Sequence, residues 1–115
     1  MDYKFINPEY LRSVSGGDRE IESELITMFR EQSTEIYEEF IASLSEGNYS
    51  LLGQLAHKAK SSVAIMGMED LAAMLKNFEI QAKESNSSEH YESYISRFKS
   101  DTDAAVLELE DYLNH

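Results

Sequence analysis

Apolar side chains recur every three or four residues along most of this chain, and very little interrupts them. The 115 residues contain one proline, Pro8, and five glycines. Proline and glycine are the residues that most often break helices, so this composition leaves room for long uninterrupted helices. No alternating strand pattern competes with the helical spacing. The sequence therefore predicts an all-α fold.

Capping residues mark where the helices begin and end. Asn7 with Pro8 is a typical helix start, Asp18 can cap a long second helix, and Gly47 can end that helix. The polar loop at residues 84–88 separates the last two helices. The predicted helices span about residues 7–14, 18–46, 48–66, 69–84 and 89–113.

The short connections between these long helices imply antiparallel neighbours. We expect a single domain over residues 1–115, an up-and-down antiparallel four-helix bundle with an additional short N-terminal helix beside it. The short helix is expected to pack on the bundle through Tyr10, Leu11 and Val14. The inner stripe of the second helix is expected to consist of Ile21, Leu25, Met28, Phe29, Ile36, Phe40 and Leu44.

Charge and composition exclude several classes of function. The net charge of −12 argues against binding to nucleic acid or to anionic lipid surfaces. With no cysteine, the chain can form neither a disulfide nor a thiolate metal site. It contains no apolar stretch of about 20 residues and no apolar signal-peptide core at its start. A cytoplasmic protein is expected, with no cofactor bound by this chain.

The acidic residues are unevenly placed. No Asp or Glu occurs between Glu46 and Glu69, a segment that holds His57, Lys58 and Lys60. A strongly acidic chain thus contains one locally basic segment, which can receive an anion or an acidic partner. We expect no carboxylate close to His57.

At about 100° per residue, His57 lies opposite the apolar face of its helix and should point into solvent. The residues predicted to share its face are mostly small, although exposed helix faces usually carry long charged side chains. They are Ser50, Gly53, Gln54, Lys60, Ser61 and Ala64. This pattern indicates a surface without long side chains, on which another protein can approach the imidazole.

A neutral imidazole nitrogen is a good nucleophile near neutral pH and can attack a phosphoryl group. Lys60 lies one turn along the same face and can contact phosphoryl oxygens as a mobile charge. The Ser61 hydroxyl can donate a hydrogen bond to the same oxygens. The chemistry of these residues therefore suits the acceptance of a phosphoryl group by His57.

The segment from His57 to Gly67 resembles the active-site helix of histidine phosphotransfer (HPt) domains. That family has a lysine three residues after the histidine and a glycine ten residues after it, as here. Residues 71–79 resemble the helix that follows in the family, and residues 16–29 resemble the entry into its first long helix. Ser61 departs from the pattern, because the family usually has glycine directly after the lysine.

The resemblance implies that His57 is phosphorylated on its outer ring nitrogen and that Lys60 supports the phosphoryl group. The donor and acceptor would be response-regulator receiver domains that supply the aspartate and Mg²⁺, and a hybrid sensor histidine kinase is a further candidate partner. Without an ATP site the chain would be a phosphocarrier, rather than an autonomous enzyme, and a monomer. Contact with the partner is expected at Gly53, Gln54, Lys58, Ala64 and Gly67.

Two other classes of function are weighed against this one. The same bundle can be an interaction module whose histidine is never phosphorylated. An enzyme active on small molecules would need a nucleophile, a base and an orienting group together, and the sequence suggests no such set. His90 and His115 are expected to be solvated, and the histidines show no metal-ligand spacing.

Overall fold

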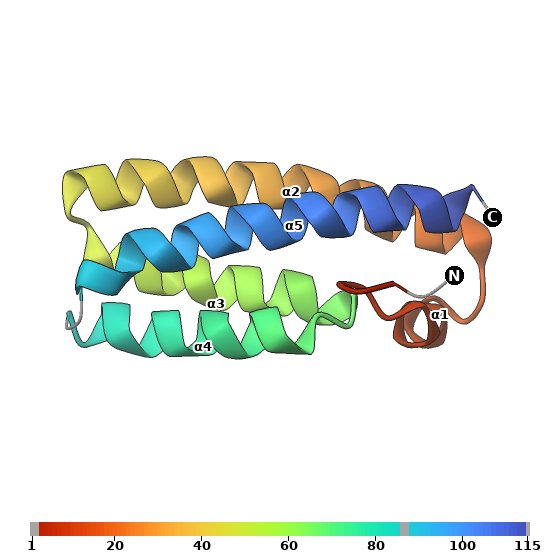
Figure 1. Cartoon of the computed structure of the whole chain (residues 1–115), viewed down its shortest axis with the longest axis horizontal. Helices are drawn as coiled ribbons and strands as arrows, with labels where there is room; N and C mark the ends of the chain where they lie inside the picture. The colour runs from red at the N-terminus through yellow and green to blue at the C-terminus, as the bar shows by residue number, and fades with distance from the viewer. Residues whose placement is uncertain (1–2, 86–87, 115) are drawn as a thin grey trace.

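The computed structural model describes residues 3–85 and 88–114 as a helical bundle (Figure 1). Its elements are α1 (Pro8–Ser15), α2 (Arg19–Glu46), α3 (Tyr49–Ile65), α4 (Glu69–Lys83), the 3₁₀ turn η1 (Ser88–His90) and α5 (Tyr91–Leu113). No strand occurs in the described residues, so the all-α prediction is confirmed. No helix in this part of the chain is long and apolar enough to span a membrane.

The helix ends lie within a residue or two of those expected from capping. Asn7, Asp18 and Asn48 each accept backbone N–H groups at a helix start, and Gly47 ends α2 in a left-handed conformation. The last helix begins at Tyr91, later than expected, because residues 88–90 form a 3₁₀ turn. Residues 86 and 87 of the expected polar loop lie outside the described residues.

The four long helices form the predicted up-and-down bundle. α2 packs against α3 and α5, and α4 packs against the same two helices. At the centre, the ring centroid of Phe40 lies 5.4 Å from those of both Phe78 and Phe98. These rings come from α2, α4 and α5, and each is at most 1% exposed. Burying such a side chain contributes about 1.5–3 kcal/mol, so this contact is central to the packing.

The short helix α1 lies under the overhang of the two longest helices. α2 has 28 residues and α3 has 17, so α2 is longer by about 16 Å at about 1.5 Å per residue. α1 occupies the space beyond the ends of α3 and α4 and crosses the bundle axis (Figure 1). Of the three residues expected to pack on the bundle, Leu11 is buried, whereas Tyr10 and Val14 are 47% and 46% exposed. The expectation that all three residues pack on the bundle was wrong, because a two-turn helix presents one narrow face.

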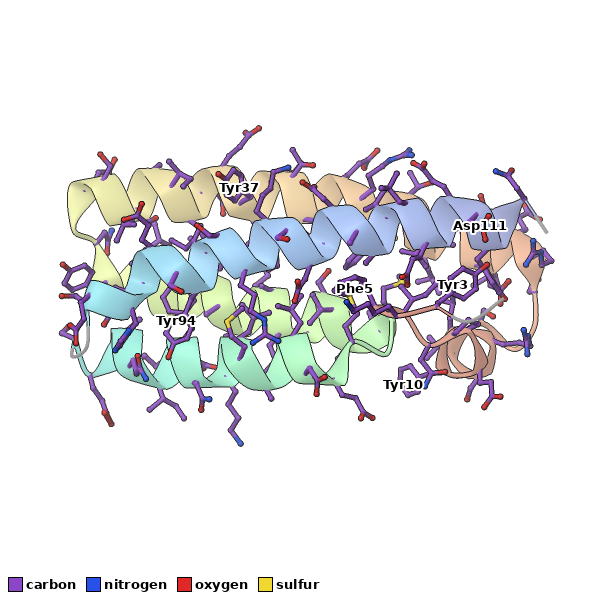
Figure 2. The ribbon with its side chains drawn as sticks, viewed as in Figure 1. Tyr3, Phe5, Tyr10, Tyr37, Tyr94 and Asp111 are labelled. Atoms are coloured by element: carbon purple, nitrogen blue, oxygen red, sulfur yellow. The ribbon has the colours of Figure 1, made fainter. Side chains whose placement is uncertain are left out.

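The N-terminal arm is tied to α5 and to the end of α3. The Glu108 carboxylate accepts the backbone N–H groups of residues 4, 5 and 6 at 2.9–3.1 Å. The Tyr3 hydroxyl donates to Asp111 at 2.8 Å, and Figure 2 shows the arm running along this helix. The Asn7 N–H donates to the Met66 carbonyl at 3.1 Å. The arm therefore holds the end of the helix that carries His57.

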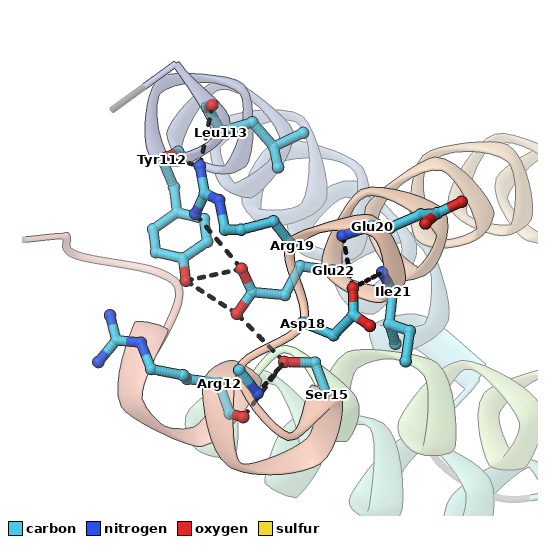
Figure 3. Close-up of polar contacts among 10 residues, drawn as sticks. Arg12, Ser15, Asp18, Arg19, Glu20, Ile21, Glu22, Tyr112 and Leu113 are labelled. Atoms are coloured by element: carbon cyan, nitrogen blue, oxygen red, sulfur yellow. Dashed lines mark hydrogen bonds and ion pairs between the residues drawn. The ribbon is translucent and has the colours of Figure 1, made fainter.

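A buried carboxylate joins α1, α2 and α5 (Figure 3). Glu22 is 1% exposed and accepts hydrogen bonds from the Tyr112 hydroxyl at 2.9 Å and the Ser15 hydroxyl at 3.2 Å. Arg19 donates to Glu22 at 3.3 Å and to the Leu113 carbonyl at 3.0 Å. A buried charge is tolerated only when it is paired and hydrogen-bonded, and Glu22 meets both conditions.

Two residues assigned to the inner stripe of α2 lie on its surface. Ile21 is 42% exposed and Met28 is 51% exposed, so their assignment to the core was wrong. They lie on the edge of the apolar face, next to Phe29 and Glu22, which are buried. Helical spacing gives the middle of a buried face more reliably than its width.

We predict that Gly67→Ala destabilises the fold more than Gly47→Ala. Both glycines have positive φ, +74° and +70°, so alanine costs about 1–2 kcal/mol at either position. A Cβ at Gly67 would also lie 2.5 Å from the Asn7 Cβ, whereas a Cβ at Gly47 meets nothing within 4 Å. Urea unfolding should show an extra loss of about 1–3 kcal/mol for Gly67→Ala. Equal losses would contradict this account of Gly67.

We predict that Tyr112→Phe lowers the free energy of unfolding by about 1–3 kcal/mol, because Glu22 stays buried with one donor fewer. Urea unfolding with an unchanged m-value measures the loss. Tyr10→Phe is the matched control, since Tyr10 is 47% exposed and should change stability by less than about 0.5 kcal/mol. If Tyr112→Phe lowers the free energy of unfolding no more than the control does, the Tyr112 hydroxyl contributes nothing to the stability of the contact around Glu22.

Candidate functional site

His57 lies in the middle of α3 and points away from the core. Its side chain is 60% exposed, while Leu55, Ala56 and Ala59 beside it are buried. The helical period alone predicts this orientation, and the structure confirms it. The imidazole is accessible to a second protein.

Glu79 of α4 contacts the inner side of the imidazole. Its Oε2 and Oε1 lie 3.1 and 3.3 Å from His57 Nδ1, and its side chain is 11% exposed. The expectation that no carboxylate lies near His57 was therefore wrong. The acid-free segment is real in the sequence, but the antiparallel packing of α4 brings Glu79 alongside it.

Two lysines flank the Glu79 carboxylate. Lys83 Nζ donates to Oε2 at 2.7 Å, and Lys60 Nζ lies 3.6 Å from Oε1. The hydrogen bond from Lys83 is the main reason that the pKa of Glu79 lies below its usual value. Burial acts in the opposite direction, and the hydrogen bond with His57 lowers the pKa further. Glu79 is therefore ionised at neutral pH.

The ionised carboxylate determines which imidazole nitrogen is free. A carboxylate only accepts hydrogen bonds, so Nδ1 of His57 must carry the proton that it shares with Glu79. In the neutral ring, Nε2 then keeps its lone pair on the exposed side. The arrangement can present Nε2 as a nucleophile and can stabilise positive charge on the ring.

Gly53, expected on the exposed face, is buried between α3 and α4. A Cβ at this position would lie 2.9 Å from Cγ of Lys83 and 3.5 Å from the Glu79 carbonyl oxygen. The expectation that Gly53 lies on the partner surface was therefore wrong. Gly67 is only partly exposed, and its missing side chain makes room for Asn7.

The other predicted contact residues Gln54, Lys58 and Ala64 are exposed, as is Ser61. The Ser61 hydroxyl donates to the His57 carbonyl at 3.4 Å.

His90 lies away from this site, with its Nε2 3.7 Å from Glu89 Oε1. His115 lies outside the described residues. Among the residues that the structure describes, no group of three potential ligands could hold a metal ion.

Exposed apolar side chains lie near the contact between α2 and α3. The Ser62 hydroxyl donates to the Gln32 side chain at 3.3 Å and so joins the two helices. Met28 lies one turn before Gln32, and Ile65 lies one turn after Ser62. Because the helices are antiparallel, both turns extend in the same direction. Met28, Ile65 and Ile21, which are 51%, 38% and 42% exposed, form what we call the α2–α3 patch.

The sequence interpretation missed Glu79 and Lys83 as site residues. An i, i+4 Glu–Lys pair on a surface helix usually indicates nothing beyond local stabilisation. Only the pairing of α3 with α4 brings this pair to His57. The α2–α3 patch was missed because its α2 residues were assigned to the core.

Comparison with known proteins bears on the family and the fold of the chain. The Hpt domain family matches residues 24–114. The crystal structure of histidine-containing phosphotransfer protein B from Pseudomonas aeruginosa PAO1 has a TM-score of 0.86, and the match covers 98% of this chain and 97% of that one. The sequence identity is 19%, so this likeness concerns the fold. No curated protein matches the chain. Since the family match covers most of its length, the chain belongs to the Hpt domain family, the histidine phosphotransfer domains of phosphorelays.

Proposed function

We propose that His57 accepts a phosphoryl group from the aspartate of one receiver domain and passes it to another. The observation that carries this proposal is the contact of His57 Nδ1 with Glu79, which leaves Nε2 exposed with its lone pair. An exposed histidine without such a partner would present either nitrogen. Family membership supports the same assignment.

In the proposed step, the Nε2 lone pair attacks the phosphorus of the aspartyl phosphate. The N–P bond forms as the P–O bond to the aspartate breaks, and its electron pair goes to the aspartate carboxylate. The ring keeps its proton on Nδ1, and its positive charge faces Glu79 at 3.1 Å. Transfer to the second receiver reverses these changes. The receiver supplies the Mg²⁺ in both directions.

Lys60 is the residue that we assign to the phosphoryl oxygens. It lies one turn from His57, its side chain is 30% exposed, and its distance of 3.6 Å from Glu79 leaves it free to turn outwards. The Ser61 hydroxyl can rotate away from the His57 carbonyl and donate to the same oxygens. The chain thereby contributes orientation and charge to the reaction.

The α2–α3 patch is the surface that we propose for receiver docking. Exposed apolar side chains commonly mark interaction sites, and Ile65 of this patch lies on α3, the helix that carries His57. The exposed Gln54 and Ala64 extend the same surface along α3. A receiver that covers the patch would also exclude water from the transferring group.

We predict that His57→Gln abolishes phosphorylation and that His90→Gln leaves it unchanged. The protein is mixed with Mg²⁺ and each of a panel of phosphorylated receiver domains, and acid-labile, base-stable phosphate is detected by intact mass. His90 is the matched control, since its side chain is also 60% exposed. Absence of label on the wild type with every receiver would favour a non-phosphorylated interaction module. Label on His57→Gln would exclude His57 as the acceptor.

We predict that Met28→Asp slows phosphoryl transfer from a subsaturating receiver by about tenfold, equivalent to about 1.4 kcal/mol of docking energy. Ile41→Asp is the control, because Ile41 is 46% exposed on another face of the same helix. Stopped-flow or quench-flow transfer rates distinguish the two variants. Equal slowing by both would locate docking elsewhere and indicate only a charge effect.

A further inference from the structure

The two lysines beside Glu79 are not equivalent. Lys83 makes a hydrogen bond of 2.7 Å, whereas Lys60 stays at 3.6 Å, beyond hydrogen-bonding distance. Lys83 lies one turn after Glu79 on α4, so the helix itself brings the two groups together. Lys60 reaches the same carboxylate from α3. Of the two cations, Lys60 can leave Glu79 at the lower cost.

Gly53 determines whether Lys83 can take this position. A glycine within a helix is unfavourable relative to alanine, so Gly53 needs a reason. Its absent Cβ leaves space for the stem of Lys83, whose Cγ lies 2.9 Å from where that Cβ would be. The stem lies against Gly53 of α3, and its ammonium group donates to Glu79 at 2.7 Å. Alanine at this position would push the stem away.

We propose that Lys83, for which Gly53 leaves space, is the permanent counter-ion of Glu79. Lys60 is thereby free to bind the phosphoryl group on His57. This inference rests on the proposed function. It makes Lys83 a positioning residue that acts through Glu79.

The charges of the site support this division between the lysines. A phosphoryl group brings about two negative charges to a ring whose other nitrogen already contacts Glu79. Each of the two anionic groups then has a lysine within reach: Lys83 for Glu79, and Lys60 for the phosphoryl oxygens. Without Lys83, Glu79 would compete with the phosphoryl group for Lys60.

The test is a double-mutant cycle on the rate of transfer from a phosphorylated receiver. Lys83→Met and Gly53→Ala should each slow transfer severalfold, and Lys83→Arg should restore most of the rate. In a Glu79→Gln background, Lys83→Met should have no further effect, because there is no charge left to neutralise. The control is Lys99→Met, which removes an i, i+4 lysine–aspartate pair of 3.0 Å on α5. Equal slowing by Lys83→Met in both backgrounds would overturn the proposal.

A second readout requires no phosphoryl transfer. The ¹³C signal of the Glu79 carboxyl is followed against pH in the unphosphorylated protein. Lys83→Met and Gly53→Ala should raise the pKa of Glu79, because each removes the hydrogen bond that lowers it most, and Lys83→Arg should not. If no receiver labels the wild type, the proposed function fails and this titration alone decides the role of Lys83. An unchanged titration in both variants would overturn that role.

Discussion

The close packing of α3 against α4 is the contact on which the rest of the site depends. His57 and Lys60 come from α3, Glu79 and Lys83 come from α4, and neither helix alone holds a carboxylate against an imidazole. Gly53 makes room for Lys83 within this contact, because a Cβ there would lie 2.9 Å from Lys83 Cγ. The N-terminal arm fixes the same helix pair from its end, through the Asn7–Met66 hydrogen bond.

Glu22 and Glu79 are the buried carboxylates among the described residues, and their surroundings explain why only Glu79 belongs to the site. Glu22 is 1% exposed and is enclosed by two hydroxyl groups and Arg19, so its oxygens are already occupied. Glu79 is held by lysines and by an imidazole whose far side is open to solvent. Glu22 fixes three helices in place, whereas Glu79 can respond to a change in charge on its partner.

The sequence was sufficient for the parts of this fold that depend on one helix at a time. Capping residues such as Asp18 placed the helix ends, and the helical period alone turned His57 outwards. The site also depends on how α4 is shifted and rotated against α3. The position of α4 relative to α3 brings Glu79 to Nδ1 of His57 and buries Gly53 under Lys83. No local sequence pattern encodes this position.

The exposed edge of α2 was misjudged for a related reason. Met28 lies beside the buried Phe29 and shares the apolar period, but the period does not say how much of a helix its neighbours cover. α1, α3 and α5 all pack against α2, yet the edge of its apolar face that carries Ile21 and Met28 stays exposed.

If His57 carries a phosphoryl group as proposed, weak binding of that group by the site is an advantage. A carrier must release what it accepts, so its affinity for the phosphoryl group must stay close to that of its partners. A partly exposed lysine such as Lys60 contributes about 1 kcal/mol or less, far less than a bound divalent metal ion. Glu79 orients the ring in both directions of transfer without binding the phosphoryl group itself. A site built from one oriented ring and one mobile cation therefore suits reversible transfer better than a site that encloses the phosphoryl group.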